Sequence, residues 1–313
     1  MTETTGCVAC EGGAVAPDGR CWDCGAAQPG FRSHLEITAS DGAAGVSDRG
    51  LRRGVNADAM ALATVGAWTA GVVCDGVSMS PRPERAAQVA AEAGVTALAA
   101  GLRAGLLPED ALTSAAMRAS RAVSALAAPP LDAPACTYVA GIAGPEGIWT
   151  CWIGDSRAYW LPDEGVGMAL TEDDVGEHDA LAAWLGADAG EPEPRIRGYR
   201  PHGPGLLLLC TDGLWRHLPD PDALRDHSAP HRRPAPRHHD ALHEHSDLHG
   251  RGNGPEHGEG LGNGEGPGNG AAYGHGGLLQ GARSLVGYAL DAGGQDNVTA
   301  LLIPVAGPRC RRG

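Results

Sequence analysis

The sequence predicts an α+β fold, because short apolar runs, two long Ala- and Leu-rich stretches and further apolar runs follow one another along the chain. The apolar runs are bounded by Gly, Pro and Asp, as strands commonly are. The two long stretches, 83–103 and 108–126, each begin with Pro near an acidic residue, which is a typical helix start. This order favours separate layers of sheet and helix over a repeating strand–helix–strand sheet.

Each predicted element follows from such a run. The predicted strands are 59–65, 71–74, 136–142, 148–153, 158–161, 206–210 and 298–305. A third helix is expected near 281–291. Residues 227–277 are rich in His, Gly, Pro and Asn and have almost no branched apolar side chains, so they cannot bury enough surface to offset the entropy of ordering. We therefore expect a globular domain over 34–306 with a disordered insert at 227–277, preceded by a Cys-rich segment at 1–30.

Composition excludes several classes of function. The chain has 313 residues and 42% hydrophobic residues, enough for a packed core. Its formal net charge of −14 argues against binding nucleic acid. No run approaches the ~20 apolar residues of a membrane span, and the N-terminus lacks the basic and apolar regions of a secretory signal. We expect a cytoplasmic protein without a membrane partner, whose cysteines are reduced thiols or metal ligands.

Four cysteines near the N-terminus form two Cys-x2-Cys pairs separated by ten residues: Cys7, Cys10, Cys21 and Cys24. Four thiolates at this spacing can close a tetrahedral zinc site, which would staple a segment too short and too polar to fold alone. Disulfides and free thiols are the alternatives, and a reducing compartment disfavours the disulfides. We predict one structural Zn²⁺ here. The segment resembles the zinc-ribbon-like headers of some bacterial signalling proteins.

Aspartates lie at the ends of four predicted strands. Asp75 ends GVVCDG, Asp155 ends TCWIGD, Asp212 follows LLLLCT and Asp296 comes just before VTALLI. In antiparallel sheets such ends can meet at one edge, where clustered carboxylates repel one another unless a hard divalent cation such as Mg²⁺ or Mn²⁺ binds them. Asp-Gly and Gly-Asp pairs also form ordinary turns at strand ends. Spacing alone leaves both interpretations open.

Five segments, in chain order, resemble the successive signatures of the type-2C, metal-dependent protein phosphatases. They are GLRRGVNADA (50–59), VVCDG (72–76), GDSRAYWL (154–161), LLLLCTDGLW (206–215) and GGQDNVTALL (293–302). The resemblance covers about 35–305 without the insert. It implies an αββα sandwich, in which two antiparallel sheets pack together between outer helices and the metals lie in a cleft at one end.

The resemblance also implies a ligand set. Asp75 would bridge two Mn²⁺ or Mg²⁺ ions, with the Gly76 carbonyl as a further ligand. Asp212 and Asp296 would hold the second ion. Asp155 would help to bind a third, weaker ion, so that the centre holds two or three.

Three further residues take roles from the same resemblance. Arg53 would clamp the substrate phosphate, Asp58 would orient a metal-bound water, and Asn297 would support Asp296. The implied reaction is hydrolysis of phosphoserine and phosphothreonine on proteins by metal-activated water, opposing a Ser/Thr kinase.

The sequence departs from the family at three places. Ala57 stands where the family usually has Glu, which removes an acceptor for metal-bound water. Val77 follows the Asp-Gly pair in DGVSMS, so no His general acid is available there. The flap segment after Thr171 is short and Pro-rich. These departures motivate an alternative, a catalytically weak pseudophosphatase acting as a regulatory phosphoprotein-binding module; a second alternative is an enzyme for small phosphoesters.

The other cysteines and the histidines have simpler interpretations. Cys74, Cys136, Cys151 and Cys210 lie in apolar runs and are expected to be small buried hydrophobes. The His-rich insert can bind metals loosely, but a solvated low-complexity loop is the favoured interpretation.

Overall fold

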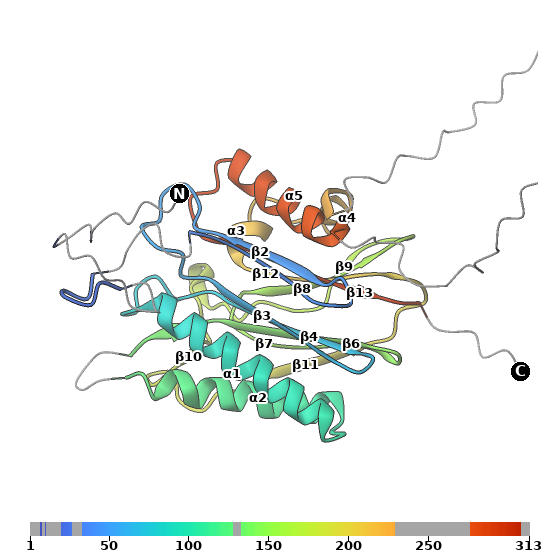
Figure 1. Cartoon of the computed structure of the whole chain (residues 1–313), viewed down its shortest axis with the longest axis horizontal. Helices are drawn as coiled ribbons and strands as arrows, with labels where there is room; N and C mark the ends of the chain where they lie inside the picture. Colours follow the sequence, from blue (N-terminus) through green and yellow to red (C-terminus); the bar gives the residue numbers. More distant parts are fainter. Residues whose placement is uncertain are drawn as a thin grey trace, which may run out of the picture.

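The computed structural model describes residues 7, 10, 20–26, 33–127, 133–228 and 276–307. Two antiparallel sheets are stacked face to face, with α1 and α2 on one outer side and α3, α4 and α5 on the other (Figure 1). This arrangement confirms the predicted αββα sandwich. The insert lies outside the described residues except for its ends, and the predicted segment 1–30 is described only around its four cysteines.

The first sheet has six strands in the order β1-β2-β13-β12-β8-β9. Their bounds are β1 His34–Thr38, β2 Ala44–Asp48, β13 Val298–Val305, β12 Gly205–Cys210, β8 Arg157–Pro162 and β9 Met168–Ala169. The centre of this sheet is almost wholly apolar because β12 and β13 are buried on both faces.

The second sheet has five strands in the order β11-β7-β6-β4-β3. Their bounds are β11 Arg195–Tyr199, β7 Gly147–Ile153, β6 Tyr138–Gly144, β4 Trp68–Cys74 and β3 Ala59–Val65. A separate two-stranded sheet pairs β10 (Leu185–Gly186) with β5 (Ala135–Cys136).

The helices are α1 Pro83–Arg103, α2 Pro108–Ser124, α3 Asp212–Trp215, α4 Pro221–Ser228 and α5 Gly277–Asp291, with a short 3₁₀ turn at Glu177–Asp179. α1 and α2 begin at the prolines that predicted them and carry acidic residues in their first turns. α1 buries Ala86, Ala87, Ala90 and Ala91. This i, i+3, i+4 spacing makes one apolar helical face. None of the described helices combines the length and the apolarity that a membrane crossing needs.

The core lies between the sheets and beneath each helical layer. Val73, Val139, Leu207, Leu209 and Leu301 are fully buried and meet between the two sheets. The four strand cysteines, Cys74, Cys136, Cys151 and Cys210, are each 0% exposed, which confirms the prediction that they are small buried hydrophobes.

The three five-residue strands, β1, β2 and β11, are absent from the strands that the sequence predicts; β2 lies inside its sheet, between β1 and β13, whereas β1 and β11 are edge strands. β1 reads HLEIT and β11 reads RIRGY, so polar residues dominate both. They lie at sheet edges, where pairing on one side only makes a long apolar run unnecessary. On the other side of the sandwich, α4 packs on α5: the rings of His227 and Tyr288 lie 4.5 Å apart between centroids, and the Ser228 carbonyl lies against Gly281.

Candidate metal centre and N-terminal cysteine cluster

The sheet topology brings the strand-end aspartates to one end of the sandwich. β4 and β7 both pair with β6 in antiparallel fashion, so they run in the same direction, and Asp75 and Asp155 follow their ends. In the facing sheet, Cys210 of β12 pairs with Ala300 of β13. The end of β12 and the start of β13 are therefore neighbours, and so are the positions of Asp212 and Asp296.

Two glycines are required by close approach of the backbone. A Cβ on Gly213 would lie 2.0 Å from the carbonyl oxygen of Asn297, and one on Gly76 would lie 2.6 Å from that of Pro83. Any larger residue would push these backbones apart. The two Asp-Gly pairs in the sequence therefore reflect tight packing around the carboxylates, beyond the needs of a simple turn.

Hydrogen bonds hold the loops around the aspartates. The backbone N–H of Asp75 donates to Thr137 Oγ1 at 3.0 Å, and Thr137 Oγ1 lies 2.7 Å from Ser156 Oγ. The indole N–H of Trp215 donates to the carbonyl of Asp155 at 3.0 Å. These bonds join the ends of β4, β7 and β12 into one frame.

Asn297 fixes the loop that carries Arg53 and Asp58. Its Oδ1 accepts the backbone N–H of Ala57 at 2.9 Å, and its Nδ2 donates to the carbonyls of Arg49 at 2.8 Å and Val55 at 3.1 Å. Sequence reasoning expected Asn297 to support its neighbour Asp296. The contacts show in addition that it positions the loop over 49–57.

Asp58 is held deep inside the site and is only 1% exposed. Desolvation raises its pKa to about 7, although Thr299 and Thr211 lower it by donating hydroxyl hydrogen bonds. Both bonds reach Oδ2, at 2.7 Å from Thr299 and 2.9 Å from Thr211. Asp58 Oδ1 is buried and has no hydrogen-bond partner among the described residues.

Burial and neighbouring negative charges raise the pKa values of the other aspartates. Desolvation raises the pKa of Asp75 well above its usual range, and the charges of the four other aspartates raise it further. Asp155 has a pKa raised to about 6, by desolvation first and then by Asp212 and Asp173, while Arg216 lowers it. Asp75 therefore lies within electrostatic reach of the four other aspartates, an arrangement that partly buried carboxylates resist unless cations are near.

The donor set fits divalent cations of the hard, oxygen-binding kind. Like Asp58 Oδ1, Asp212 Oδ1 is buried without a partner among the described residues. Such oxygens are costly to leave unpaired, and Mg²⁺ or Mn²⁺ would satisfy them. Gly76 stands directly after Asp75, so the structure brings all five predicted metal-ligating residues to the same end of the sandwich.

Arg53 reaches the same cluster. Its Nε and Nη2 donate to Asp296 Oδ1 and Oδ2, each at 2.7 Å. These bonds raise its pKa, and the charges of Asp296, Asp75 and Asp212 raise it further. Two parallel N–H groups of this kind also match two oxygens of a phosphate.

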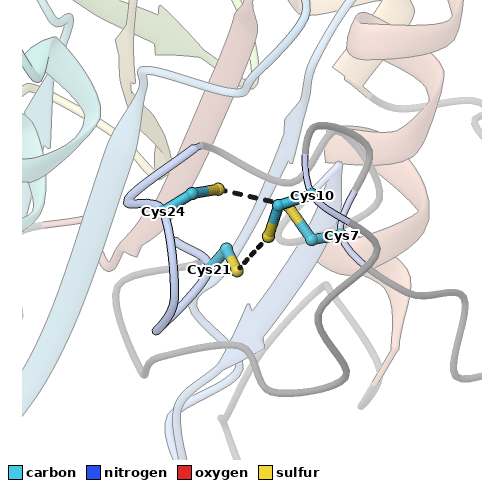
Figure 2. A group of neighbouring side chains, drawn as sticks. All are labelled: Cys7, Cys10, Cys21 and Cys24. Carbon is cyan, nitrogen blue, oxygen red and sulfur yellow. Dashed lines mark hydrogen bonds between the residues drawn. The ribbon is translucent and has the colours of Figure 1, made fainter.

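The N-terminal cysteines form a second, separate cluster (Figure 2). All four sulfurs lie within 4.8 Å of one another, with Cys7 to Cys24 at 3.6 Å and Cys10 to Cys21 at 3.5 Å. A tetrahedral zinc with Zn–S bonds of about 2.3 Å places its sulfurs about 3.8 Å apart. The four residues therefore fit a zinc ion.

This cluster is attached to the αββα sandwich. Arg20 forms an ion pair with Glu84 in the first turn of α1, and Arg20 also donates to the carbonyl of Gly25 at 3.0 Å. The pair is largely buried, since the Arg20 side chain is 25% exposed and the Glu84 side chain 11%.

Sequence reasoning missed three residues of the carboxylate site. Thr211 and Thr299 anchor Asp58, and Arg216 bonds Asp212. Thr211 stands directly before Asp212 and Arg216 four residues after it, so their closeness to a predicted ligand was the available signal. Nothing in the sequence marked Thr299, because its contact with Asp58 spans 241 residues.

The αββα sandwich and the aspartates at one of its ends agree with the architecture that the sequence resemblance implies. The family model for protein phosphatase 2C matches residues 51–245, and the chain belongs to that family. No curated protein sequence matches it.

Several solved structures share the fold. The Ser-Thr phosphatase MsPP of Mycobacterium smegmatis, in complex with cacodylate, is 22% identical with a TM-score of 0.53, covering 87% of this chain and 100% of its own. PppA of Pseudomonas aeruginosa is 22% identical with a TM-score of 0.55, covering 87% and 97%. The catalytic domain of the phosphatase PstP, with two manganese ions, is 22% identical with a TM-score of 0.57, covering 87% and 98%.

Proposed function

We propose that this protein hydrolyses phosphoserine and phosphothreonine on proteins, using a centre of two Mn²⁺ or Mg²⁺ ions. The observation that carries the proposal is the cluster of mutually repelling aspartates at one sheet edge, two of whose buried oxygens lack a partner among the described residues. Membership of the protein phosphatase 2C family supports the reaction class. The two manganese ions of PstP support the choice of metal.

The ligand set follows the predicted assignment. Asp75 would bridge the two ions with the Gly76 carbonyl as a further ligand, Asp212 and Asp296 would hold the second ion, and Asp155 lies at the outer side. Bound ions of this kind supply Lewis acidity, which makes water a stronger nucleophile at neutral pH and offsets charge on phosphoryl oxygens.

Two residues of the chain act beside the ions. Arg53 presents a pair of N–H groups, now bonded to Asp296, whose spacing suits two phosphoryl oxygens. Asp58 keeps Oδ2 fixed by two hydroxyls and leaves Oδ1 as an acceptor that orients the attacking water. Val77 follows Gly76 and has no proton to donate, so the leaving group must be protonated by water.

The cysteine cluster is proposed to hold one structural Zn²⁺. Its four sulfurs lie within 4.8 Å of one another, and a zinc ion bound by all four would have no position left for a substrate. We propose that the cluster and the catalytic sandwich work in the cytoplasm on phosphoproteins that a Ser/Thr kinase has modified.

The test measures phosphate release from p-nitrophenyl phosphate and from a phosphothreonine peptide, with Mn²⁺ or with a chelator. Release from both substrates that depends on Mn²⁺ is expected. Peptide binding without release would favour the pseudophosphatase alternative, and release from the small ester alone would favour a small-molecule phosphatase.

The role of Arg53 is tested in the same assay. Arg53→Ala is expected to raise KM about tenfold with a smaller change in kcat, because the contact to phosphate is made already in the ground state. Arg200→Ala is the matched control, since Arg200 follows the end of β11 that pairs with Ile148, away from the metal edge. A loss confined to kcat would show that Arg53 acts in the transition state alone.

A further inference from the structure

Arg216 lies at the outer end of the carboxylate cluster. It follows α3 directly and stands one helical turn after Asp212. Its Nε donates to Asp212 Oδ2 at 2.8 Å, and its Nη2 lies 3.8 Å from Asp155 Oδ2. One guanidinium group therefore reaches both carboxylates that the sequence analysis linked to the second and third ions.

The surroundings hold this guanidinium in place. Its central carbon lies 5.0 Å from the centroid of the Trp215 ring, and Trp215 itself bonds the carbonyl of Asp155. Arg157 lies closer to the same ring, at 3.5 Å, but two of its N–H groups are bonded to Asp173. Arg216 is therefore the cation that faces the cluster from this side.

An ordinary surface ion pair does not account for this geometry. Exposed i, i+4 pairs contribute little to stability and usually join two solvated groups. Here the Arg216 side chain is 53% exposed, but its partners are nearly buried: the Asp155 side chain is 14% exposed and that of Asp212 is 16%. The cation reaches inward from the surface to two desolvated carboxylates.

We propose that Arg216 is a built-in cation that replaces a third divalent ion, so that this centre binds two metal ions. The inference rests on the proposed function, because it concerns the same metal centre. Two divalent ions and Arg216 together carry five positive charges. These balance the five negative charges of the aspartates at the site, which are Asp58, Asp75, Asp155, Asp212 and Asp296. Arg53 then remains available to pair with the phosphate.

A third divalent ion would be disfavoured by the same geometry. It would have to bind Asp155 and Asp212 beside a guanidinium that never deprotonates at physiological pH. Like charges within a few ångströms of one another repel, and partial burial strengthens that repulsion. Removal of the guanidinium charge should therefore open the outer position to a metal ion.

The test counts Mn²⁺ ions bound per chain by equilibrium dialysis of the full-length, zinc-loaded protein. The wild type is expected to bind two equivalents. Arg216→Gln is expected to bind a third, in a separate and weaker phase, and the double variant Arg216→Gln/Asp155→Asn is expected to lose it again. The control variant Arg200→Gln removes an arginine next to the end of β11 that is far from Asp155. It is expected to bind two equivalents of Mn²⁺. Circular dichroism shows whether each variant is folded.

The outcomes separate this inference from the proposed function. Three equivalents in the wild type, or two in a folded Arg216→Gln variant, would overturn the role of Arg216 and leave the two-metal phosphatase standing. No Mn²⁺ bound by the wild type would overturn the metal centre itself, and this inference with it. Two equivalents in the wild type, with a third that appears on Arg216→Gln substitution and is lost without Asp155, would support the inference.

Discussion

The cysteine cluster and the aspartate cluster are two ligand sets built in opposite ways. The four sulfurs stand within 4.8 Å of one another, and no other group of three or more Cys, His, Asp or Glu side chains in the described parts of the chain is as tightly drawn together. Thiols can approach in the neutral state, whereas carboxylates repel, as the raised pKa of Asp75 shows. Four thiolates suit one zinc ion with a closed coordination shell, whereas carboxylates suit hard cations that keep water among their ligands.

The two sets also differ in their dependence on the fold. The cysteines all lie in the short segment from Cys7 to Cys24, so only contacts that are local in the sequence are needed to bring them together. The aspartates extend from Asp58 to Asp296 and meet only after both sheets have formed. Removal of zinc from the cysteines should therefore unfold the cysteine segment but leave the sandwich folded.

The largest expected effect is that of Asp75→Asn, which should lower kcat at saturating Mn²⁺ by at least about a hundredfold, or roughly 2.7 kcal/mol in the barrier. A neutral amide cannot supply the charge that a ligand shared by two cations needs. Phosphate release and the unfolding temperature are measured together, with Asp110→Asn, an exposed residue of α2, as the control. Wild-type activity in the variant would show that the metal centre has been misassigned.

Removal of the tail tests whether the two clusters are independent. A chain that begins at Phe31 should lose its one zinc and retain activity with Mn²⁺. The truncation also removes the largely buried ion pair between Arg20 and Glu84 and exposes Glu84 to water, so some loss of stability is expected. Metal analysis and the phosphatase assay check both halves, with Glu84→Gln in the full chain as the control for the ion pair. Activity that disappears with the tail would mean that the cysteine segment braces the active site.

The aspartate cluster should make a large contribution to the pH dependence of stability. In the folded, metal-free protein the pKa of Asp58 is raised to about 7 and that of Asp155 to about 6. The folded state thus binds more protons than the unfolded state above about pH 4, so the free energy of unfolding should fall as pH rises to about 7. Thermal unfolding of the chain from Phe31 with chelator measures this, and Asp58→Asn should flatten the slope. A flat profile for the unsubstituted chain would contradict the repulsion between the carboxylates.

The smallest expected effect is that of Ala57→Glu, which should lower the Mn²⁺ concentration for half-maximal activity roughly three- to tenfold by restoring an acceptor beside the metals. The backbone N–H and carbonyl of Ala57 are both already bonded, to Asn297 and Gly76, so the loop should keep its shape. Ala57→Gln is the control without the charge. An unchanged midpoint would mean that the site already compensates for the missing carboxylate.

Much of the fold could be predicted from the sequence because its central elements are continuous apolar runs. The predicted bounds of β3, β13 and α1 agree with the structure residue for residue, since Gly, Pro or Asp lies at or near the place where each run stops. The edge strands β1 and β11 could not be predicted in this way, because they are half polar and owe their conformation to pairing with β2 and β7.

Some residues of the candidate site could likewise be predicted from the apolar runs, and others could not. The aspartates could be located because each stands at the end of an apolar run. The partners of Asp58 could not, because Thr299 comes from a strand 241 residues away and bonds through a hydroxyl that every Thr carries. The inward reach of Arg216 likewise depends on the short helix α3, which the apolar pattern did not reveal.

The packing of α4 on α5 has a practical consequence for the segment between them. Ser228 and Gly281 are in contact, so the polypeptide leaves the sandwich and returns to it at nearly the same place. The two sheets and their helices should therefore tolerate changes in the length of chain that joins these two points, since doubling such a length costs only about 0.6 kcal/mol in closure entropy. An affinity tag or a fluorescent protein inserted between 228 and 276 should leave the aspartate cluster undisturbed.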